Sequence, residues 1–190
     1  DLPSLPKAAL LVIQETDRAE ASASSVAALI GQDQAITARV LRLANSAYFG
    51  LSRQVKDLQE AVVILGMRNV RNLAIVASTF PWLMRPLKGY KLGPKQMWTH
   101  SFCVAVAAKD LAQKTKLVDP DVAFTAGLLH NIGKVVLSVW IENKIETMMN
   151  FAARENITFD QMERRVLGFS HADVGAHLAE QWNLPQVFVE

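Results

Sequence analysis

Cysteine is almost absent and charge is nearly balanced in this chain of 190 residues. The single cysteine, Cys103, excludes an internal disulfide, and we expect a reducing cytoplasm as the compartment. The formal net charge is only +2, which gives no strongly basic surface of the kind that nucleic-acid-binding proteins use. The chain begins at Asp1 without a recognisable signal peptide, so we expect a cytoplasmic piece of a longer protein.

Long apolar runs are also rare, and only residues 122–141 need an interpretation. His130, Asn131 and Lys134 lie near the middle of this run. A lysine at the centre of a bilayer costs roughly 2.5–3.5 kcal/mol on insertion scales. We therefore predict that the run is buried protein core and does not span a membrane.

Proline is missing between Pro6 and Pro81, and this absence favours helices there. Apolar residues in that stretch recur at helical spacing, as at Ile36, Val40 and Leu43. Strand-like alternation is scarce, so the sequence predicts an all-α fold. The expected helices span residues 5–15, 22–30, 34–48, 58–65, 67–80, 94–115, 120–142, 143–155, 159–167 and 171–182.

Short polar motifs mark the starts of five of these helices. A side-chain oxygen just before a helix accepts a hydrogen bond from one of the first free backbone N–H groups. Proline suits the first helical position, where its missing N–H would have had no partner. The expected start signals are Asp33, Asp57 with Glu60, Asp119 before Pro120, Thr158 with Gln161, and Ser170 with Asp173.

The segment 81–89 contains two prolines and a glycine and is the expected hinge of the chain. We expect an N-terminal helical subdomain over residues 1–85 and a second helical subdomain over residues 86–190. Only the second subdomain contains histidine. Any imidazole chemistry is therefore expected there.

The four histidines are His100, His130, His171 and His177. A single histidine in an apolar helix is more often a hydrogen-bonded core residue than a ligand. Imidazoles and carboxylates from different helices can also combine into a metal site. His177 and Asp173 are four residues apart and share a helix face, so they can form a hydrogen bond with each other. The residues alone leave these interpretations open.

Longer motifs add a resemblance that covers nearly the whole chain. Residues 128–134, LLHNIGK, differ by one residue from the LLHDIGK element of the HD superfamily. The other matching elements, in chain order, are residues 2–6, 30–50, 61–66, 98–101, 170–176 and 182–185. Together they resemble the HDOD domain, an HD-related output domain of bacterial signalling proteins. The resemblance implies an HD-domain-like helical bundle.

The resemblance also implies site residues. His100 and His130 fall on the first two metal-ligand positions of HD enzymes, and Asn131 falls where those enzymes have an aspartate. His171 matches a later histidine of some HD hydrolases, and Asp173 lies near the final acidic ligand. An amide is neutral and cannot bridge two cations as a carboxylate does. We therefore expect a degenerate metal site, no catalytic residue and no bound cofactor.

Lys134 has two interpretations of equal weight. It occupies the place of a lysine that can contact phosphate in related hydrolases. Alternatively, it is a helix lysine that extends its charge into solvent.

Three functions are compatible with these features. The expected one is a non-catalytic regulatory domain of signal transduction, which contacts other signalling domains or proteins, or a nucleotide-like ligand. The second is a metal-dependent phosphohydrolase acting on nucleotides or cyclic nucleotides, with a divalent metal as cofactor. The third is nucleic-acid binding through two arginine pairs, Arg39 with Arg42 and Arg68 with Arg71, and the small net charge argues against it. We expect no nucleic-acid and no membrane partner.

Overall fold

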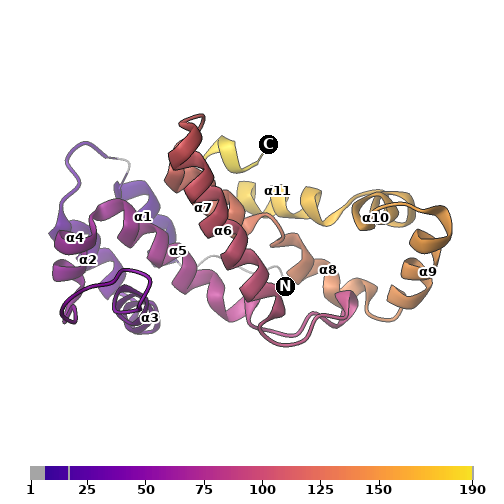
Figure 1. Cartoon of the computed structure of the whole chain (residues 1–190), viewed down its shortest axis with the longest axis horizontal. Coiled ribbons are helices and arrows are strands. Elements are labelled where there is room, and N and C mark those ends of the chain that lie inside the picture. The colour runs from indigo at the N-terminus through magenta and orange to yellow at the C-terminus, as the bar shows by residue number, and fades with distance from the viewer. Residues whose placement is uncertain (1–6, 17, 190) are drawn as a thin grey trace. The chain divides into compact units, whose positions relative to one another are not determined.

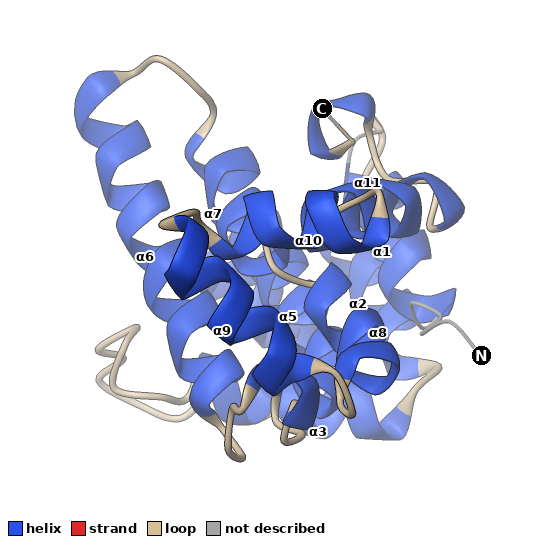
Figure 2. Ribbon diagram, turned by 90° about the vertical axis from the view of Figure 1, so that its right-hand side faces the viewer, coloured by secondary structure: helices blue, strands red, loops and turns tan. Residues whose placement is uncertain are grey.

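The structure is a computed structural model that describes residues 7–16 and 18–189. Among these residues there are helices and loops but no strand, and an isolated bridge joins Leu87 and Leu92 (Figure 2). The prediction of an all-α fold is confirmed. Motif 2–6 and the first two residues of the expected helix 5–15 lie outside the described residues. The helices are α1 (Lys7–Thr16), α2 (Ala23–Gly31), α3 (Gln34–Ala44), α4 (Leu58–Leu65), α5 (Met67–Leu83), η1 (Lys88–Tyr90), α6 (Gln96–Thr115), α7 (Pro120–Leu129), α8 (Gly133–Ile141), α9 (Ile145–Glu155), α10 (Phe159–Leu167), α11 (His171–Gln181) and η2 (Gln186–Phe188).

The chain divides into two compact units, one ending at Phe80 and the other beginning at Pro81. In the N-terminal unit the short helices surround one apolar core, because each contributes a stripe of β-branched and small residues at helical spacing. Val26, Ile30 and Val40 are fully buried in this core. The boundary lies inside α5, so residues 81–83 of the expected hinge form the last turn of a helix.

The expected helix starts are confirmed by their hydrogen bonds. The Asp33 carboxylate accepts from the Ile36 N–H at 2.9 Å, and the Asp57 carboxylate accepts from the Glu60 N–H at 2.8 Å. The same arrangement recurs, with side-chain oxygens accepting backbone N–H groups, at Asp119, at Thr158 with Gln161, and at Ser170 with Asp173. Each cap contributes about 1 kcal/mol to stability.

The expected helix 34–48 is too long, because α3 ends at Ala44. Asn45 explains the early end. Its amide nitrogen donates to the Leu41 carbonyl at 3.0 Å and to the Val55 carbonyl at 2.9 Å, while its side-chain oxygen accepts from the Val55 N–H at 2.7 Å. These bonds fix a loop against the helix end, where a continuing helix would compete for the same groups.

The expected single helix 120–142 is also wrong, because a tight turn at residues 130–132 separates α7 from α8. Bonds between residues three apart replace the α-helical pattern, from the Ile132 N–H to the Leu129 carbonyl at 2.8 Å and from the Lys134 N–H to the Asn131 carbonyl at 3.0 Å. By length and composition the stretch Pro120–Ile141 could cross a membrane, but 56% of its apolar window is buried inside the protein. Its burial agrees with the expected role as core.

Glycines allow close helix contacts in the C-terminal unit. A Cβ atom at Gly127 of α7 would lie 2.8 Å from the Cα of Ala105 in α6, and these two helices run side by side (Figure 1). At Gly133, the first residue of α8, an added Cβ would collide with the backbone of His171 and Gly175 in α11. The first contact places α6 against α7, and the second places the histidine-bearing start of α11 against α8.

Candidate functional site

His100 and His130 form the first pair of the site. His100 lies in α6 and His130 follows the last residue of α7, so the close α6–α7 contact brings them together. Their ring centroids are 5.3 Å apart. Both residues are exposed, so a ligand can reach the pair from solvent.

The turn after α7 sets the orientation of the His130 ring. Its Nδ1 lies 2.7 Å from the Gly127 carbonyl oxygen, which can only accept a hydrogen bond. In the neutral ring Nδ1 therefore carries the proton, and Nε2 keeps its lone pair. Loss of hydration lowers the pKa of His130, and the nearby charges of His100, Lys134 and His171 lower it further, although the Gly127 bond acts in the opposite direction. The neutral form is favoured.

Asn131 lies next to His130 in the same turn and is buried, with 6% of its surface exposed. By resemblance this position would hold an aspartate in an HD enzyme. A neutral amide at this poorly hydrated position needs hydrogen bonds but no counter-charge. A carboxylate there would need a cation or several donors to offset its lost hydration.

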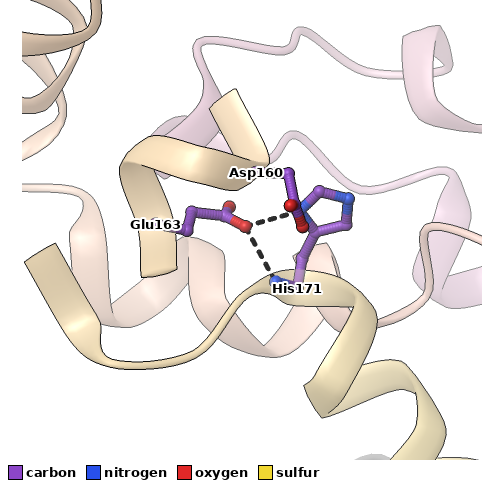
Figure 3. A group of neighbouring side chains, drawn as sticks. All are labelled: Asp160, Glu163 and His171. Atoms are coloured by element: carbon purple, nitrogen blue, oxygen red, sulfur yellow. Dashed lines mark hydrogen bonds and ion pairs between the residues drawn. The ribbon is translucent and has the colours of Figure 1, made fainter. Parts of the chain in front are cut away.

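His171 begins α11 and is held by a buried carboxylate. One oxygen of Glu163, Oε2, accepts from the His171 backbone N–H at 2.8 Å and lies 2.6 Å from the ring Nδ1 (Figure 3). The other oxygen accepts from the Tyr90 hydroxyl at 2.6 Å. Burial raises the pKa of Glu163, but these bonds outweigh it and the pKa falls below its usual value.

Glu163 and Tyr90 were missed by sequence reasoning, although one signal was present. Glu163 is fully buried. On the helix face of α10 it stands between Phe159 and Leu167, four residues away on either side and both apolar. A charged residue on an apolar face is a sign of a buried polar contact. Tyr90 has no comparable pattern around it.

Lys134 lies in the first turn of α8, and its Nζ is 5.6 Å from the centre of the Tyr90 ring. Burial lowers the pKa of Lys134, while the charge of Glu163 raises it. The side chain is half-buried and its ammonium group lies over an aromatic face, so it is not fully extended into solvent.

Asp173 is engaged at the start of α11. Its carboxylate accepts from the Ser170 N–H at 2.7 Å and pairs with the Arg164 guanidinium at 2.7 Å. Arg164 also pairs with Asp160 at 3.3 Å. His177 does not bond to Asp173 and instead lies 3.6 Å from Glu180, with its side chain exposed.

Asp160, Glu163 and His171 form a cluster whose possible ligand atoms lie within 4.8 Å of one another (Figure 3). Two atoms bound to one tetrahedral zinc ion at 2.0–2.1 Å stand about 3.3 Å apart. The Glu163 oxygen and His171 nitrogen are only 2.6 Å apart, which is a hydrogen-bond distance. In this arrangement the cluster is a hydrogen-bonded Glu163–His171 pair beside a second carboxylate, that of Asp160.

A cavity of about 430 Å³ adjoins His130 in the C-terminal unit. Small residues of α11 form part of its wall, and apolar residues of the segment after α11 form another. The small residues are Ala172, Gly175, Ala176 and Ala179. His130, Arg164 and Asp173 are its polar side chains. The volume falls within the usual range of small-molecule sites.

Known proteins share this architecture. A crystal structure of an HDOD domain protein of unknown function from Geobacter sulfurreducens is 30% identical, with a TM-score of 0.83 over 100% of this chain and 64% of that chain. A protein from Shewanella amazonensis SB2B, named as a candidate phosphohydrolase, is 30% identical, with a TM-score of 0.78 over 98% of this chain and 66% of that chain. Both have the all-helical fold that the resemblance implied.

An uncharacterised protein of Treponema pallidum (strain Nichols) is 31% identical over 188 residues. The match covers 98% of this chain but only 36% of that protein, so the chain spans about a third of this relative. The HDOD domain family matches residues 2–190. The chain therefore belongs to the HDOD family.

Proposed function

We propose that this HDOD domain is a regulatory module of signal transduction that does not hydrolyse phosphate esters. It binds a ligand or protein partner at its histidine cluster, by which we mean His100, His130 and His171. The observation that carries the proposal is Asn131, a buried amide where a metal-bridging carboxylate would be needed. Without that carboxylate, two cations cannot be held together to activate water.

The neighbouring acids do not replace the missing carboxylate. Both oxygens of Glu163 already accept hydrogen bonds from Tyr90 and His171. Asp173 and Asp160 pair with Arg164. The donors left around the pair are imidazole nitrogens, with the Lys134 ammonium nearby, and this set does not fit a dinuclear centre built on carboxylates.

The same groups support binding of a small anionic ligand. Lys134 can face negative charge, and the Nε2 atoms of His130 and His171 can accept hydrogen bonds from a ligand's donors. The cavity beside His130 offers apolar walls to the body of a ligand. A nucleotide-like molecule combines an anionic group with hydrogen-bond donors and a less polar body. Contacts with other signalling domains or proteins are the second mode that we propose, because His100 and His130 are exposed.

One observation favours hydrolase activity as a second candidate. Both His130 and His171 present Nδ1 to an oxygen acceptor, which leaves Nε2 free, as metal-ligating histidines commonly do. The Shewanella protein of similar fold is named as a candidate phosphohydrolase. In this alternative, His100, His130 and His171 would hold a single divalent metal, which would supply a Lewis acid.

A turnover assay separates the two candidates. Wild type and His130→Ala are incubated with Mg²⁺, Mn²⁺ or Zn²⁺ and a panel of phosphodiester and nucleotide substrates. The regulatory proposal predicts rates equal to the protein-free background for both proteins. Metal-dependent turnover by wild type that disappears in His130→Ala would establish the hydrolase instead. His177→Ala is the matched control, since His177 is exposed and pairs only with Glu180 among the described contacts.

A further inference from the structure

We propose that Glu163 is a positioning residue, which fixes the ring proton of His171 on Nδ1 and so presents the Nε2 lone pair as an acceptor for a ligand's hydrogen-bond donor. The inference rests on the proposed function in one respect, that His171 belongs to the ligand-binding cluster. It names no metal and no reaction, so it can be tested separately.

The geometry of two bonds to one oxygen carries the inference. Glu163 Oε2 accepts from the backbone N–H of His171 at 2.8 Å and from its ring at 2.6 Å. Because both donors belong to the same residue, the ring cannot rotate about its Cα–Cβ bond without breaking the second bond. A carboxylate can only accept, so the proton of the neutral ring must lie on Nδ1. Nε2 lies on the other side of the ring (Figure 3).

The carboxylate is itself held from its other side. Its second oxygen accepts the Tyr90 hydroxyl at 2.6 Å. Tyr90 follows Gly89, whose N–H donates to the Ser138 hydroxyl at 3.0 Å and which has no room for a side chain against the Ser138 backbone. Glu163 is fully buried and therefore has little freedom to turn. These hydrogen bonds, from Tyr90 to Glu163 and from His171 to Glu163, thus link η1, α10 and α11 in one fixed arrangement.

Helix capping alone does not account for Glu163. The start of α11 already has a cap, in which the Asp173 carboxylate accepts from the N–H and hydroxyl of Ser170. A fully buried carboxylate also carries a large cost in lost hydration, which the protein must offset with hydrogen bonds. The bond to the His171 ring is the part of this arrangement that a cap does not need.

The test is the protonation pattern of the His171 ring, read from ¹H–¹⁵N correlation spectra of its side-chain nitrogens at about pH 8, where an ordinary histidine is neutral. In wild type we expect one tautomer, with the proton on Nδ1. A proton on Nε2, or a mixture of both forms, would overturn the proposal. His130 is an internal reference, because its Nδ1 bonds to a backbone carbonyl that no Glu163 variant removes.

Variants separate positioning from a structural role. Glu163→Ala should lose the single-tautomer signature at His171 and keep it at His130, and a His171 ring that still carries its proton only on Nδ1 would overturn the proposal. Glu163→Gln should keep the signature, because the His171 backbone N–H requires an acceptor oxygen at that position. A proton that moves to Nε2 in the Gln variant would contradict the geometry. If Glu163→Ala does not fold, wild type and Glu163→Gln still decide the question.

Tyr90→Phe completes the series. It removes the bond to the other oxygen only, so we expect the His171 tautomer to stay on Nδ1 while thermal stability falls. A tautomer change in Tyr90→Phe would mean that Glu163 does not fix the ring by itself, and would overturn its assignment as the positioning residue. Because these spectra need neither metal nor substrate, their outcome is independent of whether the domain hydrolyses phosphate esters.

Discussion

The proposed function depends on one residue, Asn131. Asn131 has 6% of its surface exposed and lies beside His130, in the turn that separates α7 from α8. Its neutrality lets it remain buried without a counter-charge. An aspartate at the same place would need a cation or several hydrogen-bond donors to offset its lost hydration, because a buried carboxylate is charged.

At this residue scale, Asn131→Asp should destabilise the domain when a chelator is present. The buried carboxylate loses hydration and gains no cation, so we expect the free energy of unfolding to fall by about 1–3 kcal/mol. Urea unfolding measures it. Added Mn²⁺ should restore more stability to the variant than it adds to wild type. If the variant and wild type had the same free energy of unfolding in chelator, a carboxylate at position 131 would not need a cation.

At the scale of helices, the contact between α8 and α11 depends on one glycine. A Cβ at Gly133 would collide with the His171 and Gly175 backbone, whereas a Cβ at Gly175 would lie 3.7 Å from its nearest neighbours. Gly133→Ala should therefore cost about 1–3 kcal/mol, the usual range for overpacking. Gly175→Ala is the matched control and should be neutral or stabilising, since alanine favours helix by about 1 kcal/mol. Equal unfolding midpoints for the two variants would contradict this contact.

The hydrogen-bonded cap of α11 predicts that the stability of the domain depends on pH. The Ser170 N–H and the Arg164 guanidinium lower the pKa of Asp173, although partial desolvation acts against them. Since the folded pKa is depressed, the stabilisation is fully present above the unfolded value of about 3.9 and is lost as pH falls through the folded value. Asp173→Ala should cost about 1 kcal/mol at about pH 7 and clearly less at about pH 3.

Thr158→Ala is the control for that cap, because threonine does not titrate. Its oxygen accepts the Gln161 N–H at 3.3 Å, and its loss should cost a similar amount at both pH values. If the cost of Asp173→Ala also stayed constant with pH, the carboxylate charge would not be what stabilises the helix start.

Helix starts were predictable from sequence and one helix break was not. The caps at Asp33, Asp57 and Thr158 are local, since donor and acceptor lie within three residues. The turn at residues 130–132 has helical dihedral angles at His130 and Ile132 and contains neither proline nor glycine. The turn is followed by a close tertiary contact, that of Gly133 with α11, and such contacts do not appear in the periodicity of the sequence.

At the scale of the whole molecule, the candidate site combines residues that are far apart in sequence. His100 lies in α6 and His130 directly follows α7, and their ring centroids lie 5.3 Å apart. The hydrogen bond from Tyr90 to Glu163 joins residues 73 positions apart, and no short sequence pattern predicts it. The metal-ligand assignments of the histidines, Asn131 and Asp173 stay predictions.

Metal content tests the proposed function of the whole domain most directly. Wild type, Asn131→Asp and the double variant Asn131→Asp with His130→Ala are purified in the same way, exposed to Mn²⁺ or Zn²⁺, desalted and measured by elemental analysis. We predict that wild type holds no stoichiometric metal, that Asn131→Asp gains it, and that removal of His130 abolishes the gain. Near-stoichiometric metal in wild type would show that the imidazoles bind it without a carboxylate, and would contradict a regulatory domain that has lost its metal centre.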